Sequence, residues 1–510
     1  MKKGPQLALK PFSFFKNPPG PPLKRKPDIN NKMMLFQSTK SAAFLEEAQK
    51  FELNLYRQSL PEPAPSKAFN PNPGQLAAIN GLVAFACSSG AGNFASLIGP
   101  AGTGKSTISR IIRETLVERG YDVGLAAPTH KACGVLAAAC GVPKAETVTF
   151  ASLLALREKQ VKDKITFVRD YKRNPRLDEH RIWLCDEASM MEPELLALIG
   201  NEIDIWQKFI FIGDKAQLPP VNTGKISPAL ERDPYFELTQ VMRHDGAVLD
   251  AATAIRATTG NTWRTQFYKS VQGIGSAIHA YANKREWQLS ILDMAAKHKD
   301  DPDYFRVICY RRAEVAKYNL NIRRHIYGPS APPFLEGERL MTVEAIKDHH
   351  DPDGLPLYGS SREIVILSTN QINLTHPAFA EDVTYKTWKL KVLAEGEGED
   401  PKFIYVIDPT HEGKLQVDLN ALSTEAKNNV VYGQADWAPF WALKNVFAEV
   451  QPIYAMTVHK SQGSQFKNVF ISPDLDTAPG AKSLRRNLWY TAFTRAQSAV
   501  HLVADQEVQG

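Results

Sequence analysis

The residues best suited to do chemistry form a glycine-rich segment near position 100. The segment Gly99–Thr107 reads G-x-x-x-x-G-K-S-T; an apolar run, Phe94–Ile98, leads into it, and isoleucines at helical spacing follow it. A glycine-rich loop between a strand and a helix turns backbone N–H groups onto phosphate oxygens, and the helix N-terminus adds partial positive charge. In such a loop Lys105 reaches the β- and γ-phosphates and the hydroxyl of Ser106 is a ligand of Mg²⁺. The pattern therefore predicts a site for ATP.

A glutamine upstream of this loop is a candidate contact to the base. Gln75 precedes a predicted helix at Leu76–Ala86, and its side-chain amide offers both a donor and an acceptor to an adenine edge. The residues expected to hold the nucleotide are therefore Gln75, Gly99, Gly102, Thr103, Gly104, Lys105, Ser106 and Thr107.

An acidic pair follows a second apolar run. Ile182–Cys185 is typical of a buried strand, and it ends at Asp186 and Glu187. After a phosphate loop, a strand-terminal Asp-Glu pair predicts that Asp186 holds Mg²⁺ and that Glu187 polarises the attacking water. An isolated Asp-Glu is more often a surface pair, so the interpretation depends on the loop that precedes it.

The same arrangement recurs along the chain, which predicts an open α/β sheet. Val123–Ala127 is an apolar strand that ends at Pro128, and Phe209–Ile212 is another that ends in a polar loop, Gly213–Val221. Because parallel sheets bind ligands beyond the carboxyl ends of their strands, these loops are expected to share one edge. A polar stretch at 157–180 interrupts this unit and predicts a β-hairpin.

Composition limits the classes of function. The 510 residues carry a net charge of +6, but nine Lys and Arg against one acid in residues 1–40 give that segment +8, which leaves −2 for the rest. Binding of nucleic acid therefore requires a local groove. No apolar run approaches the ~18 residues that a membrane span needs. Charged and proline residues interrupt any signal-peptide core, and five scattered cysteines without a C-x-x-C pair suit a reducing cytoplasm.

Eight segments resemble superfamily 1 helicases in order and spacing: Gln75, GPAGTGKST, APTHKA, CDEASM, GDKAQLPPV, LTQVMR, TVHKSQGSQF and WYTAFTRA. The pattern is most similar to the 5′-to-3′ branch, in particular to its Dda-type members, with RecD-type members as relatives. The resemblance covers about residues 70–505. It implies an α/β fold of two RecA-like parallel-sheet lobes with ATP between them.

The expected division of the chain follows from composition, strand pattern and this resemblance. Residues 1–68 form a basic, Pro- and Lys-rich tail, largely disordered apart from a helix at 41–57; the tail is either a solvated leader or an arm that touches DNA or a partner. The rest divides into a first lobe at 69–236 with a hairpin insertion at 157–180, a second lobe at 237–332 and 453–510, and a β-rich, small-barrel insertion at 333–452.

The resemblance also implies roles for single residues. Gln217 is the expected γ-phosphate sensor, and Arg243 and Arg495 are the expected arginines of the second lobe, whose guanidinium groups can pair with phosphate oxygens. The residues expected to hold DNA phosphates without reading sequence are Pro128, Thr129 and His130 in the first lobe and Thr457, His459, Lys460 and Gln462 in the second.

Three aromatic residues are candidates for contact with DNA bases. Phe167 lies where the family carries a strand-splitting pin, and an apolar tip there can stack on the last base pair. Trp437 and Trp441 resemble the aromatic residues of the insertion that dock against the pin. A small packed hairpin and an ordinary core pair are the alternatives.

The sequence thus predicts an ATP-dependent 5′-to-3′ translocase and helicase acting in DNA replication, recombination or repair. The expected partners are single-stranded DNA, forked duplex and a single-strand-binding or replication protein. The chain is expected to be a monomer in the cytoplasm, or in the host cytoplasm if a phage encodes it. A partner-dependent remodelling subunit and an RNA-directed motor remain alternatives. A nuclease is disfavoured because no acidic cluster lies outside the ATP motifs.

Overall fold

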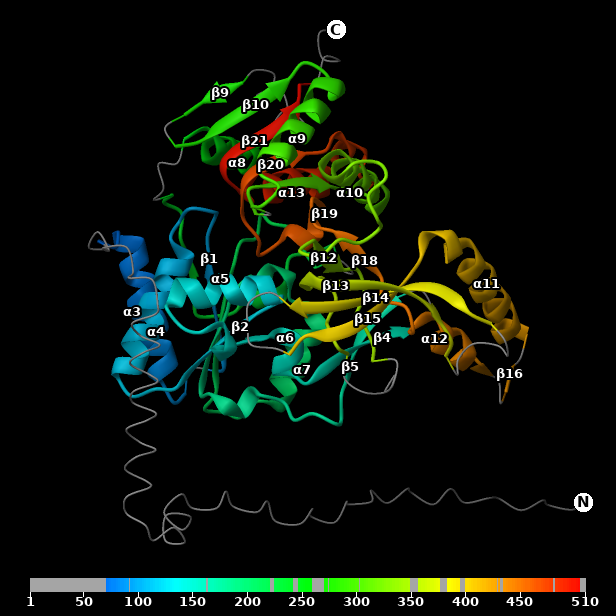
Figure 1. Ribbon diagram of the computed structural model, residues 1–510. Helices are drawn as coiled ribbons and strands as arrows, with labels where there is room; N and C mark the ends of the chain where they lie inside the picture. The colour runs from blue at the N-terminus through cyan, green and yellow to red at the C-terminus, as the bar shows by residue number, and fades with distance from the viewer. Residues whose placement is uncertain are drawn as a thin grey trace, which may run out of the picture. The chain divides into compact units, whose positions relative to one another are not determined.

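The chain divides into two units, Met1–Asn70 and Pro71–Gly510. The computed structural model describes residues 70–90, 92–161, 164–220, 224–241, 246–258, 270–273, 275–301, 303–348, 356–376, 383–394, 400–428, 430–431, 434–479 and 482–504. The predicted tail at 1–68, with its expected helix, lies outside the described residues. The fold of the second unit is shown in Figure 1.

A six-stranded parallel sheet, the first sheet, carries the glycine-rich loop. Its strand order is β3-β2-β6-β7-β1-β8. The strands are β1 (Phe94–Ile98), β2 (Val123–Ala127), β3 (Thr147–Thr149), β6 (Ile182–Cys185), β7 (Lys208–Gly213) and β8 (Tyr235–Glu237). Its helices are α3 (Pro73–Cys87), α4 (Lys105–Glu118), α5 (His130–Cys140), α6 (Phe150–Leu153) and α7 (Pro193–Glu202).

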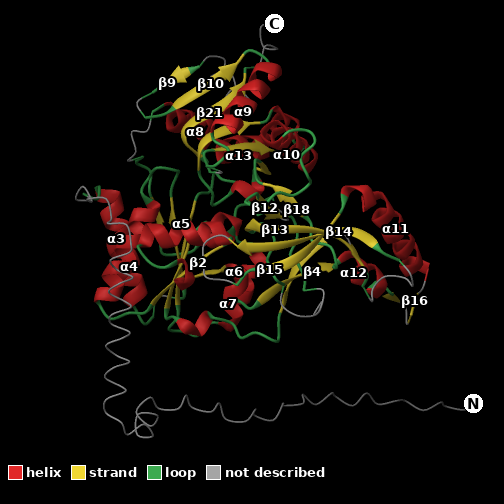
Figure 2. Cartoon of the chain, viewed as in Figure 1, coloured by secondary structure: helices red, strands yellow, loops and turns green. Residues whose placement is uncertain are grey.

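Both faces of the first sheet are buried, which explains why its strands are continuously apolar. Ile210 and Ile212 of β7 pack with residues of α3, α4 and α5 in one cluster, whereas Phe209 and Phe211 pack with α7 in another. Helices on the two sides of the strands are visible in Figure 2. The alternation along one strand therefore anchors helices on both sides of the sheet.

A second six-stranded sheet has the order β19-β11-β20-β21-β10-β9, and all of its pairs are parallel except β9 with β10. The strands are β9 (Val271–Gln272), β10 (Ala277–Tyr281), β11 (Phe305–Cys309), β19 (Ala455–Thr457), β20 (Phe466–Ile471) and β21 (Ala496–Val503). The helices α8 (Ala247–Ala257) and α13 (Lys482–Phe493) contribute to one core cluster, and α9 (Lys284–Lys297) and α10 (Arg312–Tyr327) to another.

A third sheet, antiparallel, is built from residues between β11 and β19. Its order is β15-β14-β13-β12-β18. The strands are β12 (Arg339–Thr342), β13 (Glu363–Leu374), β14 (Tyr385–Ala394), β15 (Lys402–Ile407) and β18 (Val450–Pro452). Two parallel-sheet lobes with a β-rich insertion were predicted, and this fold class is confirmed. Along the chain β18 is the last strand of the third sheet, and β19 returns to the second sheet.

Helices also occur within the predicted β-rich insertion. The helix α11 (Glu412–Asn428) buries only Ala426, and α12 (Ala438–Lys444) packs beside it; two short strands, β16 (Val430–Val431) and β17 (Gln434–Ala435), lie between them along the chain. Leu415, Leu419, Leu422 and Ala426 recur at helical spacing and could have indicated α11, but the segment was grouped with the alternating strands that precede it.

The predicted hairpin in the first lobe is present as β4 (Leu156–Val161) paired with β5 (Lys164–Arg169). Phe167 lies opposite Glu158 in the middle of β5 and is 44% exposed. The expectation of an apolar tip is therefore corrected: the strands next to the turn end at Val161 and Lys164, and Phe167 projects from the side of the hairpin.

Candidate nucleotide site and nucleic-acid groove

The strand order of the first sheet brings three loops together. The strands β6, β7 and β1 are neighbours, so the acidic pair, the loop after β7 and the glycine-rich loop emerge side by side. The backbone N–H of Gly99 donates to the carbonyl of Gly213 (3.1 Å) and ties two of these loops directly. This edge is where open α/β sheets bind ligands.

The glycine-rich loop adopts a conformation that needs its glycines. Gly102 and Gly104 have φ angles of 82° and 85°, in the left-handed region, and Gly104 caps α4. The ammonium of Lys105 donates to the carbonyls of Gly99 (2.7 Å) and Pro100 (3.0 Å). Ser106, exposed on the first turn of α4, is open to a ligand in front of the helix N-terminus.

The amide of Gln75 holds this loop in place. The side chain is 1% exposed; its oxygen accepts the backbone N–H of Asn72 (3.0 Å) and its nitrogen donates to the carbonyl of Thr103 (3.0 Å). Thr103 in turn donates its hydroxyl hydrogen to the carbonyl of Pro100 (2.9 Å). The predicted contact of Gln75 to the base stays a prediction, while the structure gives its amide a supporting place beneath the loop.

The acidic pair carries negative charge that is only partly balanced. Burial and the charge of Glu187 raise the pKa of Asp186 to about 6, although the N–H of Glu187 and the charge of Lys105 act the other way. Glu187 has a φ of 51°, an uncommon, strained conformation for a residue other than glycine. The carboxylate of Asp186 and the hydroxyl of Ser106 are hard oxygen donors of the type that Mg²⁺ takes, so these residues fit a magnesium ion held with substrate phosphates.

A buried acceptor lies on the loop after β7. Gln217 is 6% exposed, and its side-chain oxygen has no hydrogen-bond partner among the described protein groups. Burial of a polar atom without a partner costs free energy, so such an atom favours a ligand or water beside it. An amide oxygen can accept a hydrogen bond from a water molecule but not from a phosphate oxygen, so the predicted role of Gln217 as the sensor of the γ-phosphate stays a prediction.

The helix α13 of the second lobe touches the first lobe at two of these loops. The hydroxyl of Tyr490 donates to the carboxylate of Asp214 and accepts the N–H of Ala101 (3.2 Å) from the glycine-rich loop. The hydroxyl of Thr491 accepts the N–H of Leu218 (3.2 Å). Burial and the charge of Asp214 hold the pKa of Tyr490 well above its usual value, so its hydroxyl stays a donor.

Arg495 reaches the third loop. Its guanidinium nitrogen lies 4.0 Å from a carboxylate oxygen of Glu187, and the side chain is buried. It also donates to the backbone carbonyls of Thr491 (3.1 Å) and Ser464 (3.3 Å), which fix its direction. Its predicted partner Arg243 lies outside the described residues.

A cavity of about 590 Å³, here called the groove, lies beside this edge. The predicted DNA contacts that line it are Pro128, Thr129, His130, Phe167 and Gln462. Sequence reasoning missed its cations, which are Arg157, Arg173, Lys347, Arg362 and Lys402. Glu192 is the one acidic side chain among the described residues of its lining. These cations lie far apart in the sequence, so no run of basic residues could predict that they line one groove.

The other predicted DNA contacts do not line the groove. Thr457 accepts the N–H of Lys460 (3.3 Å), whose ammonium donates to the carbonyl of Val343 (3.3 Å), and burial lowers the pKa of His459. Trp437 and Trp441 each make an edge-to-face contact with Phe440, at ring distances of 5.5 and 4.9 Å, at the start of α12. Their roles stay predictions.

The three sheets meet at one lysine. The ammonium of Lys131, on α5, pairs with Asp303 (3.0 Å) ahead of β11 and with Glu363 (3.1 Å) of β13. It also lies 4.9 Å from the ring centroid of Phe466 in β20. Nearby, Gly463 approaches α5 so closely that a Cβ atom would meet that of Ala132 at 2.7 Å.

This fold and site define a two-lobed P-loop nucleoside triphosphatase, in which a helix of one lobe contacts the phosphate-binding edge of the other. Sequence families match in the same order: an AAA domain at residues 70–276, a Dda helicase SH3 domain at 333–452 and a UvrD-like helicase C-terminal domain at 452–503. The chain belongs to the superfamily 1 helicases and binds ATP through its P-loop.

Individual known proteins are similar to this chain over most of its length. The ATP-dependent DNA helicase dda of Enterobacteria phage T4 is 29% identical over 424 residues, which cover 79% of this chain and 93% of that protein. The RecBCD enzyme subunit RecD of Haemophilus influenzae is 22% identical over 450 residues, covering 81% and 67%. Among solved structures, the Pif1 helicase from Candida albicans has a TM-score of 0.40 at 14% identity, covering 86% and 95%. Within the described part of the chain, no helix has the length and apolarity to cross a bilayer.

Proposed function

We propose that this ATP-dependent DNA helicase moves 5′-to-3′ along single-stranded DNA and opens forked duplex ahead of it. The proposal depends on one observation. Tyr490 and Thr491 of α13, and Arg495 just after it, contact all three loops at the nucleotide edge of the other lobe. Hydrolysis of the nucleotide at these loops therefore changes the contacts between the two lobes. The groove beside the same edge supplies a track for a strand.

Residues of both lobes would act on the triphosphate. Lys105 moves from its loop carbonyls to the β- and γ-phosphates, and Glu187 accepts a proton from the attacking water. Gln217 and Arg495, with Arg243, hold the γ-phosphate oxygens and stabilise the charge that spreads over them. Ser106 and Asp186 would hold Mg²⁺, which would further neutralise that charge when bound.

Loss of the γ-phosphate would reopen the lobes. Arg495 then keeps Glu187 as an anionic neighbour but loses the γ-phosphate, and the contact across the cleft weakens. Pro128, Thr129 and His130 would hold the strand in one lobe, and Thr457, His459, Lys460 and Gln462 in the other. Alternate gripping by the two sets converts opening and closing into steps, while Phe167 stacks on bases beside the junction and Trp437 and Trp441 support the hairpin that carries it.

The setting follows from this activity. We place the protein as a monomer in the cytoplasm of the cell or host that holds its DNA, in replication, recombination or repair, where a single-strand-binding or replication protein presents the strand. The basic tail of residues 1–68 is the segment with the charge to contact such a partner or DNA.

An unwinding assay with tails of each polarity tests the proposal. Duplexes with a 5′ single-stranded tail should be separated in ATP and Mg²⁺, and duplexes with a 3′ tail should not. Lys105→Ala should abolish both unwinding and DNA-stimulated ATP hydrolysis, whereas Lys297→Ala, an exposed lysine on α9, should retain them. Equal unwinding of both tails would refute the polarity, and hydrolysis indifferent to DNA would refute the motor.

A further inference from the structure

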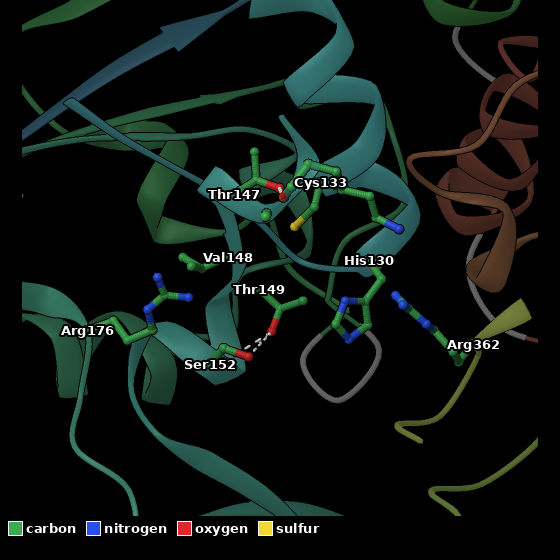
Figure 3. Close-up of a pocket in the computed structure, with 10 residues that line it drawn as sticks. His130, Cys133, Thr147, Val148, Thr149, Ser152, Arg176 and Arg362 are labelled. Atoms are coloured by element: carbon green, nitrogen blue, oxygen red, sulfur yellow. Dashed lines mark hydrogen bonds between the residues drawn. The ribbon is translucent and has the colours of Figure 1, made fainter. Parts of the chain in front are cut away.

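A second cavity, of about 230 Å³, lies beside the groove and is here called the cationic pocket (Figure 3). Three permanent cations line it: Lys144, Arg176 and Arg362. Among the described residues of its lining there is no Asp or Glu. The pocket and the groove share His130, Thr149, Ser152 and Arg362, so they are adjacent.

The cations come from different parts of the fold. Lys144 and Arg176 belong to the first lobe, whereas Arg362 precedes β13 of the third sheet and is 6% exposed. Figure 3 shows Arg176 and Arg362 on opposite sides of the pocket. Arg176 also pairs with Glu179, but both side chains are nearly half exposed, and such a pair contributes little free energy.

The positive charges that line the cationic pocket affect the ring of His130. It points toward the guanidinium group of Arg362 in Figure 3. Burial, together with the charges of Arg362 and Lys144, lowers the pKa of His130 to about 4. The pocket therefore has a positive potential even where an uncharged ring lies, and like charges from two parts of the fold face each other across it.

Hydroxyl groups complete the lining. Thr149 and Ser152 are joined by a hydrogen bond between their side-chain oxygens (2.9 Å), and the N–H of Ser152 donates to Thr149 (3.1 Å). Planar guanidinium groups, an ammonium and hydroxyls are the groups that bind phosphate oxygens, with arginine offering two parallel donors.

We propose that the cationic pocket binds one backbone phosphate of the strand in the groove and, by doing so, draws the third sheet against the first lobe. The inference rests on the proposed function, because the phosphate belongs to the translocating strand. A phosphate between Arg176 and Arg362 replaces repulsion across the pocket by two attractions. Binding of the strand and closure of the third sheet over it are then one event.

Salt dependence of binding by the full chain is the test. The affinity for a fluorescent oligo(dT) is measured without nucleotide over a range of chloride concentrations. Each phosphate contact to single-stranded nucleic acid contributes about 0.7 to the slope of log K against log salt. Arg176→Gln and Lys144→Gln should each reduce the slope, by up to that amount, and Arg176→Lys should restore most of it.

A matched control removes the same charge elsewhere. Arg119 is exposed on the first lobe and lines neither the groove nor the cationic pocket. Arg119→Gln should leave the slope at its wild-type value. Equal thermal melting curves for Arg176→Gln and Arg119→Gln establish that both variants are folded.

The outcomes separate the alternatives. A smaller slope for the pocket variants alone supports the proposal. An unchanged slope overturns it. If inorganic phosphate nevertheless raises the melting temperature of the wild type more than that of Arg176→Gln, the pocket takes free phosphate instead of the strand. Failure of the wild-type chain to bind oligo(dT) at all would refute the proposed function along with this inference.

Discussion

Replacing Tyr490 by phenylalanine isolates the contact between α13 and the nucleotide edge. The change removes only the hydroxyl, which donates to Asp214 and accepts the N–H of Ala101. The ring remains in a site that is almost fully buried, so its packing is retained. The other oxygen of Asp214 keeps its bond from the N–H of Ala216 (2.9 Å).

The expected magnitude follows from the two bonds. A hydrogen bond to a buried charged group contributes about 1.5–3 kcal/mol, and the carboxylate of Asp214 is 1% exposed, so water replaces the lost donor poorly. Ala101 is half-buried, and its N–H finds water more easily. We therefore expect the free energy that favours association of the lobes to fall by about 2 kcal/mol. This corresponds to roughly a thirtyfold smaller equilibrium constant for closing.

Steady-state ATP hydrolysis at saturating oligonucleotide measures the effect. We expect kcat for Tyr490→Phe to fall by about tenfold to thirtyfold, because fewer molecules hold Arg495 against the nucleotide edge. Tyr171→Phe is the matched control: this tyrosine, also in the described residues, is 92% exposed and should hydrolyse ATP at the wild-type rate. A kcat for Tyr490→Phe within twofold of wild type would show that the hydroxyl does not couple the lobes.

Two further predictions use positions outside the nucleotide edge. Gly463→Ala should lower the melting temperature and the affinity for single-stranded DNA more than Gly328→Ala does. Both glycines have positive φ (73° and 88°), but at Gly463 the new Cβ would also meet Ala132 at 2.7 Å. Equal effects of the two substitutions would exclude the close contact as the cause. His501→Gln should reduce acid sensitivity. Burial and the charge of His279 lower the pKa of His501 to about 3, so the unfolded chain binds the proton first, and stability present above about pH 6.5 is lost as the pH falls toward the folded value. Urea unfolding at pH 7 and pH 5 should show a loss of unfolding free energy that is about 2 kcal/mol smaller in the variant than in the wild type, and equal losses would contradict the assignment.

The first lobe could be predicted from sequence because local and global signals agree there. The predicted strands Val123–Ala127 and Ile182–Cys185 match β2 and β6 residue for residue, since strands buried on both faces read as uninterrupted apolar runs. Their loops carry the residues with chemistry, so finding the strands also found the nucleotide edge.

The groove was less accessible to prediction. Its polar contacts from motif segments, such as His130 and Gln462, were found, but its cations come from the hairpin and the third sheet. Which distant residues meet is decided by packing of whole elements, and neither periodicity nor spacing encodes it. Arg362 illustrates this: nothing in its neighbourhood along the chain indicates that it faces His130.

One backbone hydrogen bond in the first sheet can report on both ligand sites through hydrogen exchange. The N–H of Asp186 donates to the carbonyl of Ala126 (2.9 Å), where β6 on the nucleotide side adjoins β2, whose end leads to Pro128 in the groove. Its exchange with deuterium requires these two strands to separate. Occupancy of either ligand site restrains one of the strands, so this one amide should exchange more slowly with nucleotide, more slowly with oligonucleotide, and slowest with both, reporting two binding events from a single position.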